Sequence, residues 1–228
     1  MRLIWYGHAA FLVESEAPAI RVILDPYRAP DVGTYGPLDD WADIVAVSHQ
    51  NEKYHSHVSG VRGRTSGSSP FLLDGLALLG ESQPRIVEGL PFTAVRVFEN
   101  DAQQEPIAMV GVTVEGIRVL HMGDCGHRLS AKQIEACGPV DVLLALAGGP
   151  PTLALPDLVA FVTALCPRVV VPMHFGNEKI NLNLRPLPDF LALLPREIPV
   201  RSFDSPVVTV SLDSLPAETE VWVLPSAR

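Results

Sequence analysis

Short apolar runs rich in Val and Ile recur along the chain and predict a fold built mainly from β-strands. Such runs occur at roughly 2–6, 10–14, 20–24, 43–48, 92–98, 107–114, 117–122, 141–146, 168–173, 206–212 and 219–224. Apolar residues with the spacing of one helix face are rarer and occur only in the second half of the chain. We therefore expect strands to form most of the core.

Three short helices are predicted between these strands. Ser130 and Gln133 form a capping-box pattern at the start of the first. Pro156 suits the first turn of the second, in which apolar residues 158, 161, 162 and 165 follow the spacing of one buried face. Pro188 opens the third, which we expect to run through Leu194. Strands that later alternate with helices indicate a layered α/β (or α+β) fold.

We expect residues 1–228 to form a single domain.

Composition narrows the class of protein. The chain is 47% hydrophobic and 19% charged, which is typical of a folded globular protein. A net charge of −9 disfavours binding to nucleic acid or to an anionic membrane. No apolar run approaches the roughly 20 residues of a membrane span, and the start lacks a signal sequence, so we expect a cytoplasmic protein. The net charge still allows a small anionic substrate, which a locally basic cleft could bind. It also allows the protein to form a homo-oligomer.

Four predicted strands end in residues suited to metal or acid–base chemistry. Asp25, His49 and His174 each follow a buried run directly, while another run ends in His121 with Asp124 three residues later. Ligands bind at the carboxyl ends of strands in open α/β sheets. Imidazole together with carboxylate suits Zn, Mn or Fe, which activate water for hydrolysis. We therefore expect one shared site at this edge.

Other enzyme classes lack their motifs. The chain has no GxGxxG, GxxxxGK, GxSxG or HExxH sequence. His55 and His57 form an HxH pair, but no Glu follows in the spacing of a cupin metal motif, and the helices do not suit an all-β barrel.

The chain resembles the metallo-β-lactamase superfamily, in particular the branch that includes L-ascorbate-6-phosphate lactonase and many uncharacterised hydrolases. The matching segments are WYGHAAFLVE, ILDPY, VSH, VLHMGDCGH and RVVVPMHFG, in this order along most of the chain. The resemblance implies a four-layer αββα sandwich with a metal site at one edge of its two sheets. It also identifies Asp124 with the family's metal-bridging aspartate and His174 with its last histidine.

The first metal motif departs from the family pattern Ser/Thr-His-x-His-x-Asp-His. After His49, Asn51 and Lys53 occupy ligand positions, and His55 comes one residue late. The resemblance places Asn100 where the family has a further histidine. Because an amide is a weak ligand and an ammonium is not one, we expect at most one metal.

Two functions are compatible with these residues. In the first, one divalent transition metal (Zn, Mn or Fe) is held by His49, Asp124 and His174, with His55 as a fourth ligand or proton shuttle. Asp124 and His55 would then be catalytic in hydrolysis of an ester, lactone, amide or phosphodiester. In the second, Lys53 pairs with Asp124, and the protein is a metal-free, non-catalytic binding protein of the same fold.

Further residues are predicted at the edge of the site. His8 and Asp25 match family elements and are expected to orient ligands or line the site. His121 flanks Asp124 and is expected to be structural or to support a ligand. Lys179 is a candidate contact for an anionic substrate group.

Overall fold

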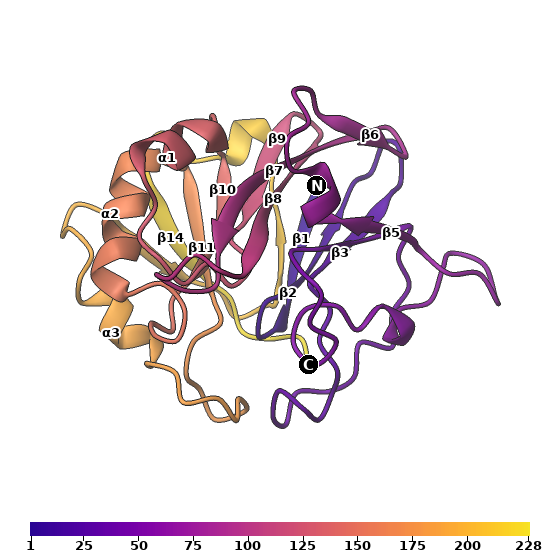
Figure 1. Cartoon of the computed structure of the whole chain (residues 1–228), viewed down its shortest axis with the longest axis horizontal. Helices are drawn as coiled ribbons and strands as arrows, with labels where there is room; N and C mark the ends of the chain where they lie inside the picture. Colours follow the sequence, from indigo (N-terminus) through magenta and orange to yellow (C-terminus); the bar gives the residue numbers. More distant parts are fainter.

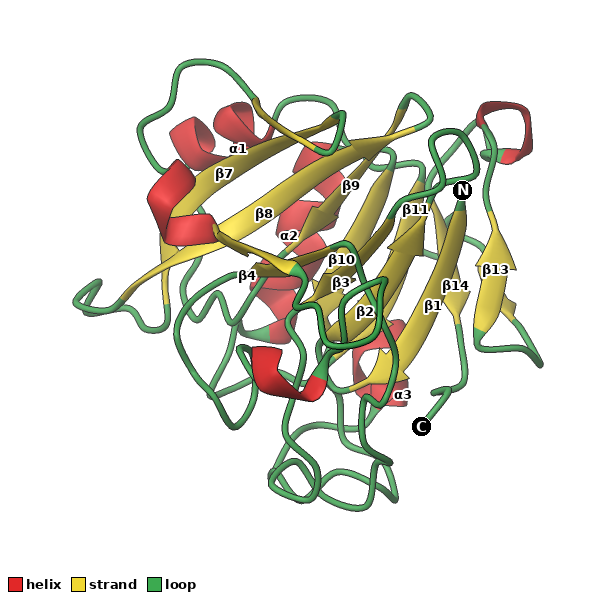
Figure 2. Ribbon diagram, turned by 90° about the vertical axis from the view of Figure 1, so that its right-hand side faces the viewer, coloured by secondary structure: helices red, strands yellow, loops and turns green.

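Two β-sheets pack face to face in the computed structural model, which describes residues 1–228 (Figures 1 and 2). The first has six strands in the order β13 (Val207–Thr209), β1 (Arg2–Gly7), β2 (Ala10–Glu14), β3 (Arg21–Leu24), β4 (Ile44–Val47) and β5 (Phe71–Asp74). The second has eight, in the order β12 (Val200–Ser202), β14 (Glu220–Val223), β11 (Val169–Met173), β10 (Val142–Leu146), β9 (Ile117–His121), β8 (Pro106–Val114), β7 (Leu90–Phe98) and β6 (Arg85–Val87).

Parallel strand pairs determine where the candidate site forms. In the first sheet β3 pairs in parallel with β4, and β4 with β5. In the second sheet β9, β10 and β11 pair in parallel. The carboxyl ends of these strands therefore lie at matching edges of the two sheets.

The six-stranded sheet is buried on both faces, and the alternation of its side chains explains why. Trp5, Phe11 and Leu24 point into a cluster of 55 buried residues that fills the space between the sheets and under the helices. Tyr6 and Leu12, on the opposite face, belong to a second cluster of 12 residues covered by the loops that follow β3 and β4. Both sets follow the period of two expected for strands.

Three α-helices cover the outer face of the eight-stranded sheet (Figure 1). They are α1 (Ala131–Cys137), α2 (Leu155–Leu165) and α3 (Leu187–Leu191). The outer layer of the other sheet consists of loops and the 3-10 turn η1 (Val58–Gly60); η2 (Gly75–Leu78) and η3 (Leu212–Ser214) are the other 3-10 turns. None of the helices has the combination of length and apolar character that a membrane span requires.

The predicted α/β sandwich of the metallo-β-lactamase type is confirmed, with local corrections. Loops and a 3-10 turn, rather than α-helices, form the outer layer on the six-stranded sheet. The Ser130 capping box begins α1 as predicted. The third helix ends at Leu191 rather than Leu194. Leu194 precedes Pro195, which disfavours helical backbone at the preceding residue. The strand pattern also missed the short strands β5, β6 and β12.

Candidate functional site

Residues from both sheets converge at the carboxyl ends of the parallel strands. Asp25 follows β3, His49 lies two residues after β4, Asp124 lies in the turn after β9, and His174 follows β11. His55 enters from the loop after β4. The long loops around residues 30 and 180 lie side by side below this edge (Figure 1), and the backbone amide of Thr34 donates to the carbonyl of Lys179 at 2.7 Å.

Asp25 fixes the orientation of two neighbours. Its carboxylate is buried and accepts hydrogen bonds from the amide of Ser48 at 2.7 Å and from the Ser48 hydroxyl at 2.6 Å. The Nδ1 atom of His55 lies 2.9 Å from the same carboxylate. Because Nδ1–H donates to Asp25, Nε2 is the atom of His55 that faces the site. A carboxylate behind a ligating histidine is the usual support of a metal ligand.

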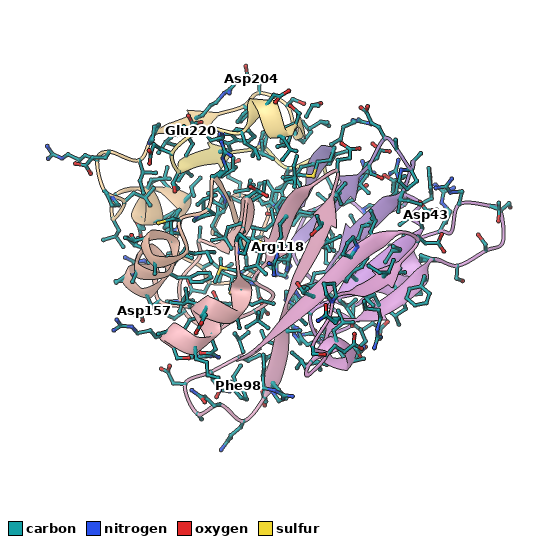
Figure 3. The ribbon with its side chains drawn as sticks, turned by 90° about the horizontal axis from the view of Figure 1, so that it is seen from above. Asp43, Phe98, Arg118, Asp157, Asp204 and Glu220 are labelled. Atoms are coloured by element: carbon teal, nitrogen blue, oxygen red, sulfur yellow. The ribbon has the colours of Figure 1, made fainter.

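Ser48 orients the His49 ring in the same way. The Ser48 hydroxyl donates its proton to Asp25, so it accepts from Nδ1–H of His49 at 2.9 Å. The other ring nitrogen, Nε2, lies 3.0 Å from Oε1 of Glu99, a contact that requires a proton between the two atoms. Glu99 follows Phe98, the last residue of β7, which is labelled at the lower end of its strand in Figure 3.

Asp124 lies between two histidines. Its Oδ2 is 2.7 Å from Nε2 of His55, and its Oδ1 is 3.5 Å from Nε2 of His174. Two sets of potential ligand atoms lie mutually within 4.8 Å: His49, His55 and Asp124 form one, and His8, His55 and His174 form the other. His55 belongs to both.

Several buried polar atoms of this cluster lack a hydrogen-bond partner in the protein. They are both ring nitrogens of His8, Oδ1 of Asp124 and Nδ1 of His174. Nε2 of His49 and Nε2 of His55 have only the carboxylate oxygens of Glu99 and Asp124 beside them, at 3.0 and 2.7 Å. An unsatisfied buried polar group costs about 1–3 kcal/mol. Such a concentration fits a site for a cation, which these residue types bind.

The pKa of His55 is raised, whereas the pKa values of His8 and His174 are lowered. Burial opposes the charged form of His55, but Asp124 and Asp25 outweigh it and raise its pKa to about 10. Burial alone would raise the pKa of Asp124, yet the charges of His55 and His174 hold it far below its ordinary value. Burial lowers the pKa of His8 and of His174, which favours their neutral, ligating forms.

Three residues of the cluster have strained backbone. His8, Asp25 and His174 have φ angles of 51°, 43° and 52°. This left-handed region costs a residue with a side chain roughly 1–3 kcal/mol and is found mainly at functional sites. Each residue directly follows a strand, so the turn directs its side chain into the cluster.

The loop that carries His55 is closed by Asn51. The Asn51 carbonyl accepts from the amides of Tyr54, His55 and Ser56 at 2.8–3.1 Å, so the loop turns tightly and delivers His55 inward. His57 lies outside the cluster, 3.8 Å from Glu52. Lys53 is exposed and makes no ion pair with Asp124, so the pairing expected for a metal-free site is absent.

Three other predicted residues have roles apart from the cluster. Both ring nitrogens of His121 bond to the main chain: Nε2 lies 2.8 Å from the Ala9 carbonyl, and Nδ1 accepts from the Gly123 amide at 3.0 Å. His121 thus holds the turn before Asp124. The Lys179 ammonium donates to the Ser226 hydroxyl at 3.0 Å and to the Arg228 carbonyl at 2.5 Å rather than facing the cluster. Asn100 lines a separate cavity of about 250 Å³.

Sequence reasoning missed Glu99 and Ser48. The resemblance pointed to Asn100, but it is Glu99, one residue earlier, that contacts His49. Successive side chains near a strand end point to opposite sides, so a shift of one residue changes which side chain reaches the site. For Ser48, its position between a strand and His49 was the available signal.

Comparisons with known proteins agree with this architecture. Residues 2–174 match the family model described as a beta-lactamase superfamily domain. A UPF0173 protein of Pyrococcus furiosus is 30% identical over 188 residues, which cover 78% of this chain and 84% of the relative. A UPF0173 metal-dependent hydrolase of Anaeromyxobacter dehalogenans is 29% identical over 204 residues, covering 76% of this chain and 74% of the relative.

A crystal structure from Thermotoga maritima, assigned to the Zn-dependent hydrolases of the metallo-β-lactamase superfamily, superposes with a TM-score of 0.73 at 26% identity. It covers 98% of this chain and 97% of its own. Since the family model spans most of the chain and the two-sheet fold is shared, the protein belongs to the metallo-β-lactamase superfamily.

Proposed function

We propose that the protein is a metal-dependent hydrolase that uses a single divalent transition metal. The observation that carries this proposal is the cluster of buried histidines around Asp124, in which both ring nitrogens of His8, Nδ1 of His174 and Oδ1 of Asp124 make no hydrogen bond. Relatives named metal-dependent hydrolases support it. We propose His55, Asp124 and His174 as ligands, with His49 beside them.

One metal is favoured because His55 has a single free nitrogen. Its Nδ1 faces Asp25, so only Nε2 is available to a cation, although both ligand sets require it. The Asn51 side chain is a neutral amide, which is a weak ligand, and Lys53 is exposed and carries an ammonium, so neither supplies the ligand that a second cation would need.

The side chains divide the work of hydrolysis. A metal in this position supplies Lewis acidity, which polarises a carbonyl or phosphoryl group and makes water nucleophilic near neutral pH. Asp25 holds His55 in the tautomer that exposes Nε2. Asp124 has a carboxylate oxygen free to accept a hydrogen bond from water and so to orient it. Glu99, half-buried beside His49, is placed to carry a proton between the site and solvent.

The substrate we propose is a small ester, lactone, amide or phosphodiester. Each of these substrates presents a carbonyl or phosphoryl group, which a metal at this site would polarise toward attack by water.

The test compares two histidines of one loop. His55→Ala should weaken Zn(II) binding by roughly tenfold or more, the size of effect seen when metal-site residues are removed. His57→Ala should change it less than twofold, because His57 lies outside the cluster. Binding is measured by competition with a chromophoric chelator, and hydrolysis with a panel of activated esters, lactones and phosphodiesters before and after chelation. Wild-type protein that binds no transition metal, or hydrolyses equally well without one, would overturn the proposal.

A further inference from the structure

His8 is a completely buried histidine with neither ring nitrogen hydrogen-bonded. Its exposed fraction is 0%, and no donor or acceptor of the protein meets Nδ1 or Nε2. Other buried histidines near the site are supported: His55 has Asp25 behind it, and His121 bonds to the main chain through both nitrogens. Native structures rarely leave a buried polar group unpaired, so the His8 ring calls for a partner.

The position of His8 is fixed by its main chain. Its carbonyl accepts from the indole N–H of Trp5 and from the amide of His174, both at 3.1 Å. The second bond ties the turn between β1 and β2 directly to the turn after β11. With φ at 51° the residue has little freedom to swing its ring elsewhere.

Three imidazoles surround one point. The ring centroid of His8 is 4.5 Å from that of His174 and 5.2 Å from that of His55, while His55 and His174 are 6.3 Å apart. Imidazoles sharing one tetrahedral zinc at Zn–N distances of about 2.0–2.1 Å have centroids roughly 5 Å apart. The observed separations bracket this value, and one potential ligand atom of each ring lies within 4.8 Å of the others.

We propose that His8 is a direct metal ligand and completes a three-histidine centre with His55 and His174, with Asp124 at its edge. This inference rests on the proposed function. It assigns the coordination that the disrupted motif at residues 49–55 lacks to the turn between β1 and β2, while His55 of that motif remains a ligand. Three neutral nitrogens and one open position form a ligand set used by catalytic zinc.

The competing set contains His49 in place of His8. The Nε2 atom of His49 already lies 3.0 Å from the Glu99 carboxylate, whereas no carboxylate makes an ion pair with His8. Since no carboxylate lies beside the His8 ring nitrogens, a metal bound through His8 leaves the contact between His49 and Glu99 intact. His49 and Glu99 are then left as a pair beside the metal.

The test uses a substitution that the backbone accepts. Asn tolerates left-handed φ, so His8→Asn removes the imidazole without adding backbone strain. The matched control is His127→Asn, because His127 is 3% exposed, also has an unpaired Nε2 and lies outside the cluster. Co(II) is the probe, since its visible absorption reports both binding and the ligand set.

We expect His8→Asn to weaken Co(II) binding by roughly tenfold to a hundredfold and to change the absorption of the remaining complex. His127→Asn should stay within twofold of wild type. Equal behaviour of the two variants, with normal Co(II) binding by wild type, would overturn the role of His8 and leave the proposed function standing. Absence of Co(II) and Zn(II) binding by wild type would instead overturn the proposed function.

A second measurement requires no variant. In wild-type protein carrying ¹⁵N-labelled histidine, Zn(II) should shift one ring nitrogen of His8 together with those of His55 and His174. A His8 signal that is unchanged while His55 and His174 shift would refute the three-histidine centre.

Discussion

The hydroxyl of Ser48 joins Asp25 to His49, and removing it should weaken the fold and the metal site together. Ser48 is fully buried, and its hydroxyl donates to Asp25 at 2.6 Å and accepts from His49 at 2.9 Å. Ser48→Ala deletes both bonds while keeping the backbone bond from the Ser48 amide to Asp25 at 2.7 Å.

The expected loss follows from these two bonds. A hydrogen bond to a charged group contributes about 1.5–3 kcal/mol, and an unpaired buried ring nitrogen costs about 1–3 kcal/mol. Because Asp25 keeps its bonds to the Ser48 amide and to His55, we expect about 3 kcal/mol in the free energy of unfolding. For a chain of this size this corresponds to a fall in Tm of roughly 6–12 °C.

The assay is urea and thermal unfolding of the chelator-treated protein, so that metal binding does not contribute to the stability. The control is Ser68→Ala, which removes an exposed hydroxyl bonded to the Thr65 carbonyl at 2.7 Å and should change stability by less than about 0.5 kcal/mol. If both variants unfold like wild type, the hydrogen-bond relay from Asp25 to His49 is wrong. Zn(II) affinity should also fall in Ser48→Ala, because His49 loses the hydrogen bond that orients its ring.

Three further outcomes follow from the site. Elemental mass spectrometry should find at most one tightly bound transition metal per chain, and two equivalents would contradict the single free nitrogen of His55. In the metal-free protein the pKa of His55 is raised from 6.5 to about 10. Protonated His55 therefore stabilises the fold fully below pH 6.5, and this stabilisation is lost as the pH rises through 10. Metal binding needs deprotonated Nε2, so Zn(II) affinity should increase over the same pH interval. Thermal melts and Zn(II) titrations from pH 6 to 10 check both trends, and His55→Gln should flatten them. Lys53→Ala should leave Zn(II) affinity within twofold of wild type, since the ammonium is exposed; a larger change would place Lys53 at the site.

Much of the fold could be predicted because most of its strands are buried. Buried strands such as β4 and β10 are continuous apolar runs, and the Ser130 capping box marks a helix start locally. The missed strands β5, β6 and β12 lie at sheet edges and expose Phe71, Ile86 and Val200, so their sequences carry neither a buried run nor a clear alternation.

The site was predictable only where a side chain directly follows a strand. Asp25 and His174 do so, and His49 nearly does. The choice between His55 and His57 depended on how the Asn51 carbonyl closes the loop, which is a main-chain property that residue identity does not reveal. The lack of hydrogen bonds at the His8 ring likewise depends on three-dimensional packing, and no pattern in the neighbouring sequence predicts it.

His8, Asp25 and His174 have left-handed backbone, which costs stability, although their side chains are needed at the site. At φ values of 43–52° a glycine would satisfy the main chain better than the residue present. Selection for thermal stability alone would thus tend to replace His8 and His174, whereas Asp25 also stabilises the fold through its bonds with Ser48. A lineage released from catalytic selection would then lose the two histidines before it lost Asp25 or the sheets. Retention of His8 and His174 on unfavourable backbone is therefore the feature that should separate functional members from relatives that keep only the scaffold.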